Sequence, residues 1–333
     1  MRFGIIGTGD AGGSFAGAAH HVPGVELLGV AGRTPERVAA LAVKMQTHAF
    51  TPDALMAAKP DCIAIATPPG VHAAQALACL RAGIHVMIEK PMALCTEDCD
   101  AVIAAAAERG LKVMVTQTWR YRDITRKARE LVASGRFGAV TCVTVRSAHN
   151  YFGGKRTGWH LEVDLAGGGV TLNPFIHMID LARFLAGDEV TEVQGYAAGR
   201  KKGYAMDGDV ICLARFARGA TAVVHVDGNG VSVEDAIDVF MTDGLLRVRP
   251  SEKRIEVVLA NRIAEVYGFG ENGLTNAKGI YGFGGYINHI LEMRDALERG
   301  GPITSDGANG RENVRIARLI LERSGLPLAR PTV

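Results

Sequence analysis

The amino-acid sequence predicts an α/β fold: a doubly wound parallel sheet, followed by an α+β domain with a large open antiparallel sheet. In residues 1–120, short aliphatic runs alternate with helical segments, which is typical of right-handed βαβ units whose strands are buried on both faces. In residues 121–333, consecutive strand-like runs separated by turn residues indicate antiparallel pairing. We therefore expect two domains, 1–120 and 121–333.

The strands expected in the first domain are short β-branched or aliphatic runs. They are Arg2–Ile6, Val25–Ala31, Cys62–Ala66, His85–Ile88 and Lys112–Val115. Thr34 is expected to cap a helix that starts at Pro35, because proline fits the first helical position. Thr96 is expected to cap another helix, and Gly83 and Gly110 are placed to end helices just before strands.

The second domain is expected to begin with a helix over 124–133 and a strand over 140–147, followed by an apolar helix over 172–186. Strands then occupy 190–258, with tight turns expected at Arg218-Gly219, Asp227-Gly228 and Asp243-Gly244. Two helices, 286–298 and 310–323, close the chain. An open sheet leaves one face uncovered, and a partner subunit is its usual cover, so we expect a homodimer or homotetramer formed through this sheet.

Charge and cysteine content exclude several classes of protein. The net charge is +2, from 37 basic and 35 acidic residues without a basic block, so neither a nucleic-acid nor a membrane partner is expected. The cysteines lack the paired spacing of a zinc site: Cys95 and Cys99 lie four apart with no second pair. A strand-like run begins at Phe3, which leaves no room for a signal peptide. We expect a cytoplasmic protein with free thiols.

The segment Gly7-Thr8-Gly9-Asp10-Ala11-Gly12 follows the first strand and opens a helix. This is the context in which a glycine fingerprint binds a dinucleotide in a Rossmann domain. Gly7 permits a tight turn, Gly9 lets the backbone approach the pyrophosphate, and Gly12 allows close packing of helix and strand. The N–H groups at the start of the helix then face the phosphates.

The end of the second strand predicts which dinucleotide binds. An acidic residue about twenty positions after the glycines would bind the ribose hydroxyls of NAD, but the chain has Gly32 there, followed by Arg33. Arg33, with Thr34 and Arg37, is suited to a 2′-phosphate through charge-assisted hydrogen bonds. We therefore expect NADP(H) to be preferred over NAD(H). The alternative is that Arg33 stacks on the adenine and both cofactors bind.

Further motifs lie at fixed places in both halves of the chain. They are Ala66-Thr67-Pro68-Pro69 with His72, Glu89-Lys90-Pro91, Gly167-Gly168-Gly169, Asn173, and Ile176-His177-Met178-Ile179-Asp180. With these motifs the chain resembles the Gfo/Idh/MocA oxidoreductases, which include glucose–fructose oxidoreductase and inositol dehydrogenase. The resemblance implies a Rossmann domain followed by a domain whose open sheet mediates dimers or tetramers.

The resemblance also implies the roles of individual residues. Lys90 would hydrogen-bond the reacting oxygen, and His177 would accept its proton, so that no metal is required. Many members of the family have aspartate where this chain has Asn173, which can orient His177 or bind a substrate hydroxyl but cannot relay a proton. We expect Asn173 on the same helix face as His177. Further cofactor contacts are expected at Thr67, Pro68, His72, Glu89 and Lys90.

Substrate recognition is expected from the segment before the triple glycine. Tyr151 and Trp159 would stack on a sugar ring, and Lys155 and Arg156 would pair with a carboxylate or phosphate. The function expected is an NAD(P)-dependent dehydrogenase or reductase that acts on a CH–OH group of a sugar, polyol or inositol-type substrate. Two alternatives stay open: a non-sugar substrate such as a cyclic diol or semialdehyde, and a non-catalytic dinucleotide-binding regulator.

Overall fold

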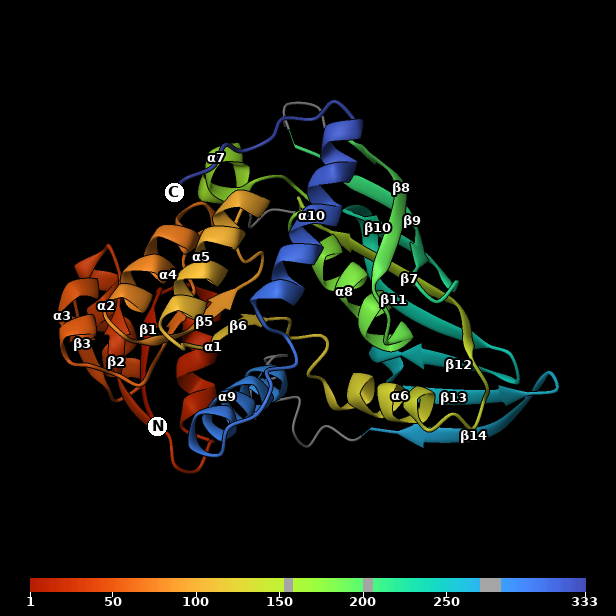
Figure 1. The fold of residues 1–333 in the computed structure, drawn as a ribbon, viewed down its shortest axis with the longest axis horizontal. Coiled ribbons are helices and arrows are strands. Elements are labelled where there is room, and N and C mark those ends of the chain that lie inside the picture. The colour runs from red at the N-terminus through yellow and green to blue at the C-terminus, as the bar shows by residue number, and fades with distance from the viewer. Residues whose placement is uncertain (153–157, 200–205, 270–282) are drawn as a thin grey trace. The chain divides into compact units, whose positions relative to one another are not determined.

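The computed structural model describes residues 1–152, 158–199, 206–269 and 283–333, which form two compact units (Figure 1). Unit 1 comprises Met1–Thr118, Gly273–Val314 and Arg330–Val333, and unit 2 comprises Trp119–Asn272 and Arg315–Ala329. The chain first passes from unit 1 to unit 2 after Thr118, two residues before the domain boundary expected after residue 120. The C-terminal part differs from the expected second domain, because the helix α9 (Phe283–Glu298) packs against α1 (Asp10–Ala19) of unit 1.

Unit 1 contains a six-stranded parallel sheet with the order β3-β2-β1-β4-β5-β6. Its strands are β1 (Arg2–Ile6), β2 (Glu26–Ala31), β3 (His48–Phe50), β4 (Cys62–Ile65), β5 (His85–Glu89) and β6 (Val113–Thr116). Each expected strand is found within one residue at either end, which confirms the doubly wound fold. The short β3 was not predicted, because three residues carry no readable period. The strand order reverses between β1 and β4, the place where doubly wound sheets bind ligands.

Helices cover both faces of this sheet because alternate residues of each strand point to opposite sides. Along β4, Cys62 and Ala64 belong to the cluster packed against α1, α2 (Pro35–Lys44) and α9, whereas Ile63 and Ile65 belong to the cluster on the other face. That second face carries α3 (Pro52–Ala57), α4 (His72–Arg81), α5 (Thr96–Glu108) and Val314 of α10 (Gly307–Arg323).

Helix ends in unit 1 follow the sequence in part. Gly83 and Gly110 have φ values of +79° and +63° and stop helices as expected. Thr34 is the N-cap of α2, although its side chain accepts no capping hydrogen bond. The expected cap at Thr96 is wrong: Cys95 is the N-cap of α5, and the Thr96 hydroxyl donates to Glu97 instead (3.2 Å).

Unit 2 contains an eight-stranded sheet with the order β14-β13-β12-β11-β7-β10-β9-β8. Its strands are β7 (Val140–Asn150), β8 (Val190–Ala198), β9 (Asp209–Phe216), β10 (Thr221–Asp227), β11 (Asn229–Met241), β12 (Gly244–Arg249), β13 (Arg254–Leu259) and β14 (Arg262–Gly268). Neighbouring strands pair antiparallel except β7 and β10. The large open antiparallel sheet is therefore confirmed.

One of the expected turns does not form a hairpin. Arg218-Gly219 joins the paired strands β9 and β10, and Asp243-Gly244 joins β11 and β12. Asp227-Gly228 instead joins β10 to β11, which lie on opposite sides of β7. The end of β7 lies between these two strands, and there the N–H of Tyr151, the residue after β7, donates to the Gly228 carbonyl (2.8 Å).

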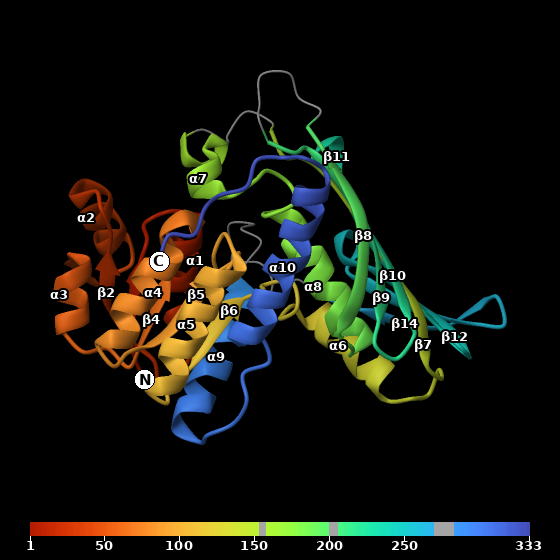
Figure 2. The ribbon, with the colours of Figure 1, turned by 45° about the horizontal axis from the view of Figure 1, so that its top comes forward.

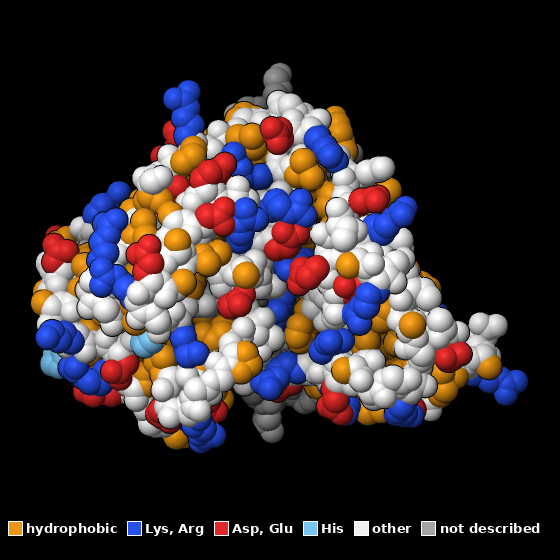
Figure 3. All heavy atoms as spheres, in the orientation of Figure 1, with side chains coloured by type: hydrophobic (Ala, Val, Ile, Leu, Met, Phe, Trp, Pro, Cys, Tyr) orange, Lys and Arg blue, Asp and Glu red, His pale blue; other side chains and the backbone are white. Residues whose placement is uncertain are grey.

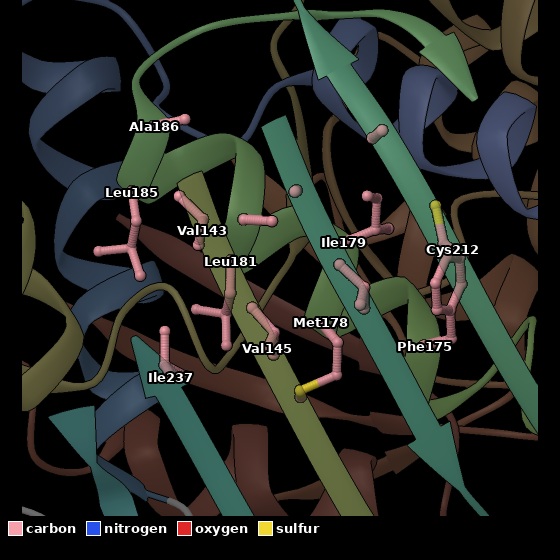
Figure 4. Packing of buried hydrophobic residues seen from close by; sticks show 14 of the residues in the cluster. Val143, Val145, Phe175, Met178, Ile179, Leu181, Leu185, Ala186, Cys212 and Ile237 are labelled. Atoms are coloured by element: carbon pink, nitrogen blue, oxygen red, sulfur yellow. The ribbon is translucent and has the colours of Figure 1, made fainter. Parts of the chain in front are cut away.

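The inner face of this sheet packs against an almost entirely buried helix, α8 (Pro174–Ala186), and against α6 (Asp123–Ala133) and the second half of α10 (Figure 2). Figure 4 shows Phe175, Met178 and Leu181 of α8 directed toward the strands that carry Val145 and Cys212. The helix begins at Pro174 rather than at residue 172, because Asn173 has φ −117° and ψ −86° and is its N-cap.

The outer face of the sheet exposes large apolar side chains. Tyr196, Ile211 and Leu213 are 63%, 44% and 50% exposed, and Tyr196 lies opposite Ile211 in the β8–β9 register. Elsewhere, charged side chains of both signs are interspersed on the face drawn in Figure 3. Among the described residues, no helix has the length and apolar character needed to cross a membrane.

Candidate functional site

The glycine turn after β1 brings backbone segments into direct contact. Gly7 has φ +134°, and a Cβ there would lie 2.2 Å from the Ala66 carbonyl oxygen. A Cβ on Gly12 would lie 2.1 Å from the Gly7 carbonyl oxygen, so the close contact of Gly12 is with the turn. By contrast, a Cβ on Gly9, the N-cap of α1, would meet no atom of the described chain within 4 Å. The turn is thus closed on its inner side and open at the helix N-terminus, which fits a phosphate group.

The end of β2 adjoins this turn. A Cβ on Gly32 would lie 3.2 Å from the Thr8 side chain. Arg33 and Arg37 follow and are exposed, and neither guanidinium forms an ion pair within the described ranges. Thr34 is half-buried. Two cationic side chains are therefore available beside the turn.

His72 connects the loops that follow β4 and β5. Its side chain is fully buried, with Nδ1 2.9 Å from the Pro91 carbonyl oxygen and Nε2 2.8 Å from the Thr67 carbonyl oxygen. The two carbonyls favour a protonated ring, but burial outweighs them and lowers the pKa of His72. The ring is buried and held at both nitrogens, so it positions the two loops, and the expected cofactor contact at His72 stays a prediction. Thr67 and Pro68 in the first of these loops are half-buried.

Glu89 is likewise buried, and its carboxylate contacts groups of unit 1. Oε1 accepts a hydrogen bond from the Tyr286 hydroxyl (3.0 Å), and Oε2 accepts one from the Lys90 N–H (3.2 Å). Burial raises the pKa of this carboxyl, while Lys90, Thr116 and Tyr286 oppose the rise. Both carboxylate oxygens of Glu89 thus have partners within the protein, and the expected cofactor contact at Glu89 stays a prediction. Lys90 is half-buried and joined to Pro91 by a cis peptide bond.

In unit 2, Asn173 and His177 lie at the N-terminal end of α8. The Asn173 amide donates to the Tyr151 hydroxyl (3.1 Å), and His177 is only 8% exposed. Because Asn173 has non-helical torsions, the expectation that it shares a helix face with His177 is wrong. Tyr151 is buried and packs edge-on against Phe152, so it holds Asn173 and has no exposed ring face for a sugar.

Trp159 lies in the short helix Gly158–Leu161, before the triple glycine. It is half-buried and stacks on His160 with ring centroids 3.8 Å apart. Lys155 and Arg156 lie outside the described residues. Of the aromatic residues expected to contact substrate, only Trp159 therefore retains an accessible surface.

Two buried carboxylates hold the segment that carries His177: Asp180, which belongs to the motif quoted above, and Asp207, which the sequence analysis did not single out. Asp207 accepts hydrogen bonds from the backbone N–H groups of Gly169 (2.7 Å) and Thr171 (2.6 Å), and from the Thr171 hydroxyl (2.7 Å). Asp180 forms a bidentate pair with Arg120 (2.9 and 2.6 Å). Neither partner could be found from sequence spacing. Within the described ranges, no group of three or more His, Cys, Asp or Glu side chains is arranged to hold a metal ion.

Comparisons with known proteins agree across both units. Residues 1–117 match the model "Oxidoreductase family, NAD-binding Rossmann fold", and residues 125–247 match the "GFO/IDH/MocA C-terminal domain". The chain is similar to a 1,5-anhydro-D-fructose reductase of Ensifer adhaerens, with 31% identity over 74% of each chain. It is also 26% identical to an inositol 2-dehydrogenase of Rhizobium meliloti, over 99% of each. Its fold is that of a levoglucosan dehydrogenase solved with NADH and L-sorbose, with a TM-score of 0.89, 22% identity, and coverage of 98% of this chain and 96% of the other.

Substitution of His72 is expected to change how stability depends on pH. Because folding lowers the pKa of His72, the unfolded chain binds the proton more readily, and stability decreases as the pH falls below about 6.5, the ordinary histidine value. His72→Gln should reduce this slope, by at most about 1.4 kcal/mol per pH unit, in urea unfolding between pH 7.5 and 5. His85 has a pKa lowered mainly by burial and supplies the comparison variant His85→Gln. An unchanged slope in His72→Gln would show that folding does not lower the pKa of this ring.

Proposed function

Because the chain belongs to the Gfo/Idh/MocA family of oxidoreductases, we propose that it is a nicotinamide-dependent dehydrogenase or reductase. Its substrate would be a sugar, polyol or inositol-type molecule that carries a secondary alcohol or the corresponding carbonyl. One observation carries this proposal. The open glycine turn after β1 and the Lys90 loop after β5 both lie at the carboxyl edge of one parallel sheet.

The residues of unit 1 fit a dinucleotide. The backbone of Gly7–Gly12 would hold the pyrophosphate at the start of α1, where Gly9 leaves space. The loop with Thr67 and Pro68, held in place by His72, would contact the nicotinamide half. When bound, the nicotinamide supplies or accepts a hydride.

The chain's own part in the reaction is to manage the proton and the charge on the substrate oxygen. We assign to the Lys90 ammonium the hydrogen bond to that oxygen, which stabilises negative charge as it develops. His177 would accept the hydroxyl proton during oxidation and return it during reduction. Asn173, whose amide is oriented by Tyr151, would bind a substrate hydroxyl, and Trp159 would contact the ring.

The test begins with fluorescence titration by NADPH and NADH, followed by turnover on polyols, aldoses and keto-sugars. Lys90→Met should lower kcat by about 10²- to 10³-fold, because a charge-stabilising donor is lost, while the Kd of the nucleotide stays within about threefold. The exposed Lys44, at the end of α2, supplies the control Lys44→Met, which should match the wild type. Wild-type kcat in Lys90→Met would remove this lysine from the mechanism, and failure to bind either nucleotide would overturn the whole proposal.

We further propose that NADP(H) is preferred over NAD(H). Two observations support this: Gly32 and Arg33, not a carboxylate, directly follow β2, and the Arg33 and Arg37 guanidinium groups are exposed and free of ion pairs among the described residues. Each can form charge-assisted hydrogen bonds to a 2′-phosphate.

Arg33→Ala should therefore weaken NADPH binding by about 10- to 100-fold, the effect of losing hydrogen bonds to a charged group, and NADH binding by less than about threefold. Arg81→Ala, at the exposed end of α4, is the control. Equal weakening of both nucleotides would mean that Arg33 stacks on the adenine and does not select the phosphate.

The outer face of the unit 2 sheet is proposed to pair with a second copy of the chain. It presents Tyr196, Ile211 and Leu213 on adjacent strands, flanked by the exposed ion pairs Arg215–Glu192 and Arg146–Glu234. A two-fold axis brings the same apolar patch of both copies together, so that each copy covers the patch of the other and no second kind of interface is needed.

Leu213→Glu should convert the oligomer to a monomer, because it would bury an unpaired charge at the centre of the patch. The measurement is molar mass by light scattering after size exclusion. Val43 is still more exposed but lies on α2 of unit 1, so Val43→Glu is the matched control and should leave the mass unchanged. A monomeric wild type, or an oligomeric Leu213→Glu, would exclude this surface.

A further inference from the structure

Tyr286 connects the C-terminal helix α9 to the Glu-Lys-Pro segment that carries Lys90. Its hydroxyl donates to Oε1 of Glu89 (3.0 Å) across 197 positions of the chain. Its ring packs edge-on against Phe15 of α1, with centroids 4.8 Å apart, so the ring is held while the hydroxyl reaches the carboxylate. Both contacts lie within unit 1.

The backbone around Lys90 is held on both sides by buried groups. On one side, Oε2 of Glu89 accepts the Lys90 N–H (3.2 Å). On the other, Nδ1 of His72 lies 2.9 Å from the carbonyl oxygen of the next residue, Pro91. The orientation of the Glu89 carboxylate therefore determines where the Lys90 backbone lies, and Tyr286 is one of the groups that set this orientation.

We propose that Tyr286 is a positioning residue for Lys90, acting through Glu89. By donating to Glu89, it keeps this buried carboxyl group aligned, so that Glu89 holds the Lys90 backbone and lies beside the Lys90 side chain. The inference concerns how Lys90 is held, and its catalytic consequence rests on the function proposed above.

The charges around these groups agree with this role. Burial raises the pKa of Glu89, and Lys90, Thr116 and Tyr286 each act against that rise. The pKa of Tyr286 is raised well above its ordinary value by burial, by Glu89 and by Asp10, so the hydroxyl stays a donor at neutral pH. The positive charge of Lys90 in turn helps to lower the pKa of His72, so Glu89, Lys90 and His72 are electrostatically linked.

The first experiment measures the coupling between Tyr286 and Glu89 by urea unfolding of the ligand-free protein. Tyr286→Phe keeps the ring contact with Phe15 and removes only the hydroxyl. At pH 8 it should raise the unfolding constant about tenfold or more, but less than about threefold in the Glu89→Gln background. The difference should shrink toward pH 5, because a protonated Glu89 accepts a weaker hydrogen bond. Equal effects in both backgrounds would overturn the inference.

The second experiment reports on Lys90 itself. Its rate of acetylation, followed by mass spectrometry at pH 8, should increase on the order of threefold in Tyr286→Phe, because a carboxylate that Tyr286 no longer aligns interacts less with the Lys90 ammonium, which favours the neutral amine. The exposed Lys44 and Lys59 should keep their rates. Tyr267 donates to Glu265 (2.5 Å) in unit 2, so Tyr267→Phe removes the same kind of hydrogen bond there and should leave Lys90 unchanged.

Turnover then separates this inference from the proposed function. Tyr286→Phe should lower kcat about tenfold, as expected for a displaced catalytic group, with the nucleotide Kd within about twofold. If coupling and labelling change as expected but no substrate is turned over by the wild type, the proposed function fails and the positioning role stands. If the wild type is active and Tyr286→Phe has wild-type labelling of Lys90, the positioning role fails.

Discussion

The ligand-binding end of unit 1 depends on one backbone contact, in which Gly7 touches both Ala66 and Gly12. A methyl group on Gly7 or Gly12 would lie 2.2 or 2.1 Å from a carbonyl oxygen, far inside contact distance. The contact joins the end of β1 to the end of its neighbour β4 and sets the first turn of α1. β1 and β4 are the central pair of the sheet, so this contact fixes the two central loops beside which the loops of the outer strands lie.

The loops around this contact are held by buried side chains as well as by backbone hydrogen bonds, such as those from the Gly7 N–H to the Ala31 carbonyl (2.8 Å) and from the Ala66 N–H to the Ile6 carbonyl (2.7 Å). His72 ties the loop after β4 to the loop after β5, and Glu89 with Tyr286 holds the backbone at Lys90. In unit 2, Asp207 does the same for the glycine-rich segment before α8. Buried polar atoms require hydrogen-bond partners, so each of these groups has a defined position. They thereby fix the backbone that carries the side chains proposed to act.

Sequence patterns predicted the parts of the fold that local periods specify. The strands of unit 1 are short apolar runs whose ends are marked by residues such as Gly83 and Gly110, and they were found within one residue. Asp227-Gly228 shows the limit of this reasoning. The dipeptide predicts a change of chain direction but does not predict which strand becomes the neighbour. In the structure, β7 lies between β10 and β11.

By itself the sequence determined the doubly wound sheet, the open second sheet and the glycine turn, because each depends on spacing along the chain. The roles proposed for Lys90 and His177 come from the family resemblance of their motifs. Only the tertiary structure decided which nearby polar residues face inward. His72, Glu89 and Tyr151, which the sequence analysis expected to touch ligands, are buried and hydrogen-bonded within their own units, to partners from 1 to 197 positions away. The reason is physical: a polar side chain buried by folding must be hydrogen-bonded, and which partner it reaches is set by packing between segments that sequence spacing does not relate.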